Sequence, residues 1–201
     1  MARKRSSETT CSITCQGYFS SFPEGIRYLY FFSYFCVSFI LSYMIAKEHI
    51  YNVTVRWTGN NGTGTSDYRS YTRNHIISAR NKPEIPGSSD PVFRGDDTKY
   101  NPEELLLASL SGCHMLWFLH FCADSGVVVV DYVDNPLGIM IEMANGGGKF
   151  KEVTLQPVIT VSREVSPDII EVLHQKAHEH CFIANSVSFP VKHRTTIKIF
   201  V

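Results

Sequence analysis

The sequence has no excess of charge of either sign, because its 201 residues include 19 lysines and arginines and 19 aspartates and glutamates. The balance removes the overall positive charge by which nucleic-acid-binding proteins attract phosphate, so we expect no nucleic-acid partner. No segment repeats with a period of about 20 to 50 residues, which excludes solenoids and propellers. A hydrophobic share of 44% and a charged share of 19% exclude an intrinsically disordered chain.

Metal-binding signatures are missing as well. Cys11 and Cys15 are not matched by a second closely spaced cysteine pair, and the sequence has no HExxH segment. His174 and His178 are four residues apart and would share a helix face, but nothing completes a metal site around them. We expect these histidines on a polar, solvent-facing side of their helix, and we expect neither a metal nor another cofactor.

Residues 1–46 differ in composition from the rest of the chain. Positions 28–46 carry no charge, and about 20 apolar residues are enough to cross a bilayer. Basic residues before this run would keep the N-terminus in the cytoplasm. Alternatively the start is mis-assigned, since Met44 precedes what looks like the opening of a soluble domain. We therefore divide the chain into an extension, 1–46, and a domain, 47–201, which is cytoplasmic or else tethered to a membrane through 28–46.

The domain has the pattern of an α+β fold. Asn101 and Pro102 are typical of a helix start, and apolar residues then recur every three or four positions until Gly126. Ser166 and Pro167 open a second helix in the same way, and residues 82–97 read as a loop. Alternating or apolar runs predict strands over 51–57, 127–132, 137–143, 150–155, 158–162, 187–189 and 195–201. The order strands, helix, strands, helix, strands indicates a largely antiparallel sheet.

Three cysteines fall in the domain, and an odd number does not suit a disulfide framework. Cys122 lies near a helix end and is expected to pack as a small hydrophobic residue. Cys113 lies on the apolar stripe of the first helix, where composition alone favours a buried structural thiol. Cys181 follows a histidine-rich helix end, where local cations can tune a thiol.

Three segments resemble the osmotically inducible protein C (OsmC) family, which includes the organic hydroperoxide resistance proteins. NPEELLLASLSGCHM resembles the central helix of that family, with Cys113 ten positions after Glu103. KAHEHCFIANSV resembles its second-cysteine segment, and VRWTGNNGTGT resembles its first hairpin. The resemblance extends from about Met44 to Val201. It implies an OsmC-like fold, with antiparallel sheets wrapped around two central helices in an intertwined homodimer.

The resemblance also implies a thiol-dependent peroxidase that reduces organic hydroperoxides. Cys113 would attack the peroxide and become a sulfenic acid, and Cys181 would resolve it as a disulfide. A dithiol, in this family commonly of the lipoyl type, would then reduce the pair. Apolar walls for the substrate are expected from Leu106, Leu110, Met115, Trp117 and Phe118.

Relatives also hold an arginine in place with the glutamate of the helix motif, which gives the nucleophile a cationic neighbour. Glu103 occupies the glutamate position, and Arg94 is the best match for the arginine, with Arg69 and Arg73 as alternatives. Ten residues of straight helix span about 15 Å, so Glu103 and Cys113 of one unbroken helix cannot touch. Either the helix breaks between them or a second subunit completes the site.

Two other interpretations remain open. In the first, the fold is a non-catalytic dimer that acts as a redox sensor or binds a small molecule or lipid. In the second, the domain is exported on a membrane tether and holds a static disulfide between Cys113 and Cys181.

Overall fold

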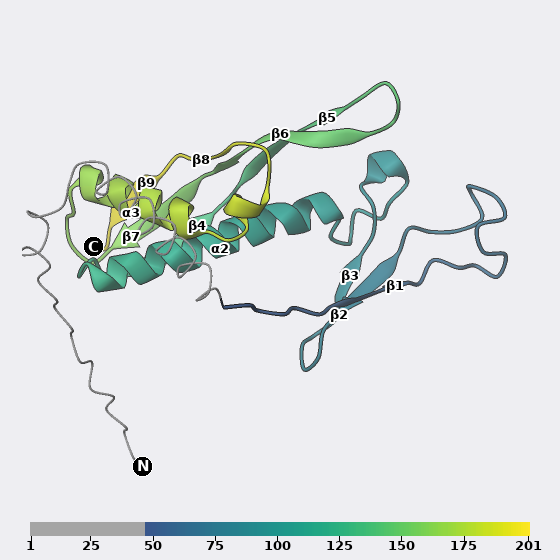
Figure 1. Cartoon of the computed structure of the whole chain (residues 1–201), viewed down its shortest axis with the longest axis horizontal. Coiled ribbons are helices and arrows are strands. Elements are labelled where there is room, and N and C mark those ends of the chain that lie inside the picture. Colours follow the sequence, from purple (N-terminus) through teal and green to yellow (C-terminus); the bar gives the residue numbers. More distant parts are fainter. Residues whose placement is uncertain (1–46) are drawn as a thin grey trace, which may run out of the picture. The chain divides into compact units, whose positions relative to one another are not determined.

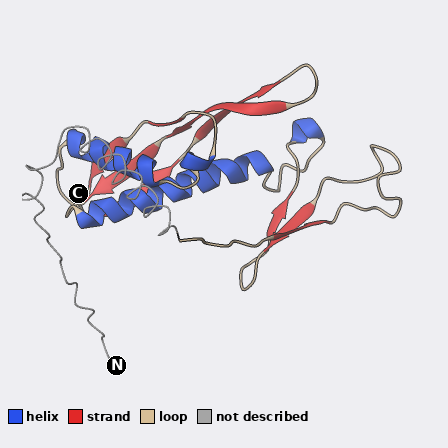
Figure 2. Cartoon of the chain, viewed as in Figure 1, coloured by secondary structure: helices blue, strands red, loops and turns tan. Residues whose placement is uncertain are grey.

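A computed structural model of the protein describes residues 47–201, so the predicted anchor or mis-assigned start at 28–46 lies outside the described residues. The chain divides into two compact units after Tyr51. The second unit, Asn52–Val201, contains all the elements named below (Figure 1), and their order of helices and strands gives an α+β fold (Figure 2).

The first sheet is antiparallel and joins three short strands in the order of the sequence. These strands are β1 (Thr54–Trp57), β2 (His75–Ser78) and β3 (Ile85–Gly87). The loop between β1 and β2 is held by Asn60, whose Oδ1 accepts hydrogen bonds from the backbone N–H groups of Gly62 and Gly64 at 2.9 Å each. The expectation that 82–97 forms only a loop is wrong, because it contains β3 and a short 3-10 helix, η1 (Pro91–Phe93).

The central helix, α2 (Pro102–Asp124), runs for 23 residues without interruption. Its predicted start is confirmed as a reciprocal cap: Asn101 Oδ1 accepts from the Glu104 N–H at 2.8 Å, and Glu104 Oε2 accepts from the Asn101 N–H at 3.1 Å. The helix is long and apolar enough to cross a membrane by length and composition alone, yet it packs against α3 in this fold.

After α2 come two further three-stranded sheets. Four strands precede the second long helix, α3 (Pro167–His180), which is followed by a 3-10 turn, η2 (Ala184–Ser186), and two last strands. The six strands are β4 (Val129–Asp134), β5 (Leu137–Glu142), β6 (Gly148–Leu155), β7 (Pro157–Val161), β8 (Val191–His193) and β9 (Thr196–Ile199). The strand predicted at 187–189 lies instead at 191–193.

The sheets have the orders β4-β7-β9 and β5-β6-β8. The hairpin partners β5 and β6, and also β4 and β7, are antiparallel, whereas β6 pairs with β8 and β7 pairs with β9 in parallel. The parallel pairs depart from the largely antiparallel pattern expected. They arise because α3 lies between β7 and the last two strands, and a helical crossover brings the chain back in the same direction.

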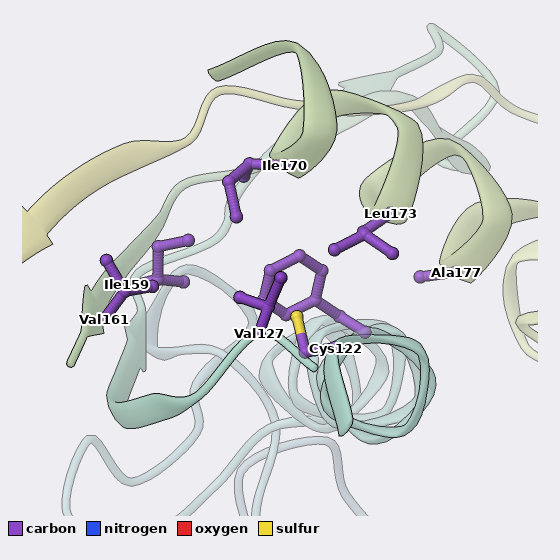
Figure 3. Close-up of a cluster of buried hydrophobic side chains, with 8 residues drawn as sticks. Cys122, Val127, Ile159, Val161, Ile170, Leu173 and Ala177 are labelled. Atoms are coloured by element: carbon purple, nitrogen blue, oxygen red, sulfur yellow. The ribbon is translucent and has the colours of Figure 1, made fainter. Parts of the chain in front are cut away.

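Two apolar clusters hold the domain together. The first fills the space between α2, α3 and β7, and Figure 3 shows Cys122 facing the α3 side chains Leu173 and Ala177 there. Cys122 is only 1% exposed, which confirms its expected role as a small core residue, and burial raises the pKa of its thiol to about 12. The second cluster centres on Leu110, Val153 and Leu155.

Replacing the α2 cap tests this description of the fold. Asn101→Ala removes the hydrogen bond that the Asn101 side chain accepts from the Glu104 N–H and should lower the free energy of unfolding by about 1 kcal/mol. Asn101→Asp keeps the acceptor oxygen and should remain close to the unsubstituted protein. Urea unfolding followed by circular dichroism measures both, and equal losses for Asp and Ala would show that the cap contributes nothing.

Candidate active site

Cys113 and Cys181 are brought together by the packing of α2 against α3. Cys113 lies midway along α2 and is half-buried, whereas Cys181 caps the C-terminal end of α3 and is fully buried. Both are free thiols in this structure. Of the four expected catalytic residues, Cys113, Cys181, Arg94 and Glu103, the single chain places these two side by side.

The Cys181 thiol is held in its protonated form. Burial raises its pKa to about 11, and hydrogen bonding and charge repulsion from Cys113 act in the same direction. The backbone N–H of Ala184 donates to Cys181 Sγ at 3.4 Å and partly offsets these effects. Cys181 therefore keeps its proton at neutral pH, and Cys113 is the more accessible of the two thiols.

Aromatic side chains come together from the helix segments that carry the two thiols. Trp117, one turn after Cys113, lies with its ring centroid 5.2 Å from that of His180 and 6.0 Å from that of Phe182. In the second apolar cluster, Leu106 and Ile183 both pack against buried residues that include Leu110.

Two of the expected walls lie elsewhere. Phe118 belongs to the first cluster, and Met115 lines an open cavity of about 900 Å³ together with Tyr132 and Asp134. Both face away from the thiol pair because successive helix residues are rotated by about 100°.

A pair of buried imidazoles joins the same two helices, α2 and α3, that carry the thiols. His114, the residue after Cys113, and His174 of α3 are 2% and 0% exposed, and His114 Nε2 lies 2.9 Å from His174 Nδ1. The His174 ring also stacks on Phe118, with 4.0 Å between centroids, and lies 4.9 Å from His193. His193 Nε2 in turn lies 3.1 Å from Glu171 Oε2 on α3.

The expectation that His174 faces solvent is wrong. Ile170, Leu173 and Ala177 form the buried stripe of α3, and His174 falls within it at the i+4 position from Ile170. The spacing alone would have placed His174 on the buried side of the helix, but a histidine side chain is usually expected to face solvent. Burial lowers the pKa of His114 to about 4 and that of His174 to about 3, so both are neutral at pH 7.

The three candidate arginines share one pocket away from the thiols. Arg69, Arg73 and Arg94 line a cavity of about 280 Å³, none of whose lining residues lies on α2 or α3. The Arg73 guanidinium lies 4.4 Å from the ring centroids of both Tyr68 and Tyr71.

The turn that carries Arg94 requires an unusual backbone. Arg94 has a φ of 65°, and a Cβ on the following Gly95 would collide with the Ser89 carbonyl oxygen. The one carboxylate of the pocket, Asp96, is engaged by Lys99 and Thr98, which lower its pKa to about 2. Within residues 47–201 of the single chain, none of the three arginines forms an ion pair with a carboxylate.

Glu103 does not reach the arginine expected for it within the single chain, and it is far from Cys113, as the helix length predicts. It lies in the first turn of α2, and no ion pair joins it to Arg94 in the described part of the chain. Because α2 is unbroken, the ten residues from Glu103 to Cys113 separate them by about 15 Å.

Fold and site together define an α+β domain in which two of the three thiols, Cys113 and Cys181, lie side by side where two helices pack together. Residues 95–196 match the family described as OsmC-like protein. The chain belongs to this OsmC-like family, which confirms the resemblance seen in the sequence. No curated protein matches it.

Solved structures share the fold. An OsmC-like protein of unknown function from Vibrio cholerae is 30% identical, with a TM-score of 0.67 over 74% of this chain and 99% of its own. An organic hydroperoxide resistance protein from Elizabethkingia anophelis is 20% identical, with a TM-score of 0.56 over 77% and 100% of the two chains. Another from Legionella pneumophila is 18% identical, with a TM-score of 0.55 over 75% and 99%.

The neutral imidazole pair predicts a loss of stability in acid. The unfolded chain protonates His114 and His174 near pH 6.5, whereas the folded protein does so only near pH 4 and pH 3. The unfolded state therefore binds more protons below pH 6.5, so the free energy of unfolding is highest above pH 6.5 and falls as the pH drops toward 4. The loss should be on the order of 3 kcal/mol for each imidazole.

His174→Asn isolates the contribution of the His174 imidazole. Asparagine does not titrate, whereas the carboxylates, which also affect stability in acid, are the same in both proteins. The urea midpoint of the variant should fall less steeply between pH 6.5 and pH 4 than that of the unsubstituted protein. Parallel curves for the two proteins would contradict the assignment.

Proposed function

We propose that the protein is a thiol-dependent peroxidase that reduces organic hydroperoxides to alcohols. The observation that carries the proposal is the pairing of one half-buried thiol with one fully buried thiol where two helices pack together. Membership of a family whose solved members include organic hydroperoxide resistance proteins supports it.

Cys113 is the proposed nucleophile. Its thiolate sulfur attacks the terminal oxygen of the hydroperoxide, the O–O bond breaks, and the leaving alkoxide takes up a proton to become the alcohol. Cys113 is left as a sulfenic acid. Cys181, whose raised pKa keeps it protonated, is suited to the second step rather than the first.

Cys181 is the proposed resolving residue. Its sulfur attacks the Cys113 sulfenic sulfur, the S–O bond breaks, and the hydroxyl group leaves as water with the Cys181 proton. An external dithiol, for which a lipoyl-type compound is a suitable class, then reduces the disulfide and is itself oxidised. Such a reductant fits the cytoplasmic location expected from the sequence.

Arg94 and Glu103 are proposed to complete the site across a homodimer. The arginine pocket lies away from the thiols of its own chain, and its one carboxylate is engaged by Lys99. The central helix also exposes apolar residues, such as Leu116 at 65%, beside the cavity lined by Met115. A second copy that covers this face of α2 would place its own Glu103 and arginine pocket against residues of the first copy.

Cysteine variants test the peroxidase. Cys113→Ser should abolish consumption of tert-butyl hydroperoxide in the presence of dihydrolipoamide or dithiothreitol, because no thiolate attacks the peroxide. Cys181→Ser should still consume about one equivalent in a single turnover without forming the disulfide. Cys122→Ser is the matched control and should turn over normally, since that thiol lies in the core. Consumption at the uncatalysed rate by the unsubstituted, fully reduced protein would contradict the function.

Mixing two inactive variants tests the shared site. Chains with Cys113→Ser and chains with Glu103→Gln should each have low activity. If Glu103 serves the partner's thiol, a heterodimer contains one intact site, and unfolding and refolding the variants together should restore about a quarter of normal activity for a random mixture, since half of the dimers are mixed. Mixtures no more active than their components would show that the residues act within one chain or not at all.

A further inference from the structure

The imidazole pair is a directional contact between the two helices that carry the thiols. Among residues 47–201, the bond between His114 and His174 is the one side-chain hydrogen bond from α2 to α3 formed by nitrogen or oxygen atoms. The other contacts between the two helices near it are apolar, through Phe118, Leu173 and Ala177. Apolar packing is non-directional, whereas a hydrogen bond weakens steeply when its angle or length changes.

The imidazole pair and the thiol pair join the same two helices. On α2 the histidine directly follows Cys113, and on α3 His174 precedes Cys181 by seven residues, which is two helical turns. His174 and Cys181 therefore lie on the same face of α3, and both are completely buried. A shift of α3 along or around its axis would change the imidazole contact and the thiol contact together.

Only one of the two nitrogens of His174 takes part in the contact. Nδ1 meets His114, whereas Nε2 is buried without a hydrogen-bond partner. A buried unpaired polar atom is unfavourable, and a leucine would fill this place in the stripe without that penalty. The histidine at this position therefore provides a hydrogen bond to His114, which an apolar side chain cannot form.

Disulfide formation is sensitive to the position of α3 relative to α2, which this contact fixes. The two Cβ atoms must come to about 3.8 Å from each other with a restricted dihedral angle, and a misplacement of about 1 Å can slow a reaction about 100-fold. Attack of Cys113 on a diffusing peroxide places no such demand on α3.

We propose that the His114–His174 pair positions α3 so that Cys181 resolves the Cys113 sulfenic acid before a second peroxide oxidises it. His174 is thus a positioning residue that acts through Cys181. The inference rests on the proposed peroxidase function. In the competing reaction, a second hydroperoxide transfers its terminal oxygen to the sulfenic sulfur, which becomes a sulfinic acid while the peroxide is reduced to the alcohol.

Single-turnover kinetics of the full-length protein test the proposal. The reduced protein is mixed with tert-butyl hydroperoxide, quenched at intervals with dimedone, and analysed by intact mass for sulfenic acid, disulfide and sulfinic acid. His174→Phe keeps the ring and its burial but removes the hydrogen bond. It should slow disulfide formation at least about tenfold and accumulate sulfinic acid, while the rate of peroxide consumption in the first turnover stays within about twofold of normal.

Two matched variants separate positioning from stability. His174→Asn places an amide where Nδ1 lies, and because Nε2 has no partner, it should restore disulfide formation to within about threefold of normal. Leu173→Ala leaves a cavity in the adjacent core position but keeps the imidazole pair, so it should destabilise the protein without increasing sulfinic acid.

Each outcome decides the matter. Normal resolution in His174→Phe, or equal slowing in Leu173→Ala, overturns the proposal while leaving the peroxidase intact. If the unsubstituted protein forms neither sulfenic acid nor disulfide and consumes peroxide only at the uncatalysed rate, the peroxidase itself is overturned. If circular dichroism shows that His174→Phe is unfolded, His114→Leu removes the same hydrogen bond from α2 and is judged by the same criteria.

Discussion

The structure depends on one constraint, which is that the central helix is apolar on all sides. From Leu105 to Ala123 it carries no aspartate, glutamate, lysine or arginine. A helix that is hydrophobic all round is stable in water only when it is covered all round. One chain covers a single stripe, formed by Leu110, His114, Phe118 and Cys122 at intervals of four. The remaining apolar surface is the physical reason to expect a second copy of the chain.

The same stripe decides the accessibility of the thiols. Cys113 lies one residue before His114, at the border of the buried stripe, and is therefore half-buried. Cys181 lies on the buried face of α3, where that helix ends, and is fully enclosed. An accessible thiol beside an enclosed one is the asymmetry that the proposed two-step chemistry requires. The geometry of the helix pair, rather than any local motif, produces it.

Local signals predicted the local structure well and the pairing of distant segments poorly. The cap at Asn101, the start of α3 after Ser166 and the core role of Cys122 all follow from side chains that act on their immediate neighbours. The strand β3 was missed because Pro86 and Gly87 are typical of loops. The parallel pairing of β8 with β6 and of β9 with β7 depends on where α3 returns the chain, and a short stretch of sequence does not show this.

By itself the sequence determined the helices, the apolar nature of α2 and, through its motifs, the family and the two cysteines of interest. Only the tertiary structure showed that His174 is buried against His114, that the three arginines share one pocket, and that Glu103 remains far from its own Cys113. The reason is physical. A cap or a helical stripe is set by residues within a few positions of one another, whereas burial and side-chain partners depend on which distant elements pack together.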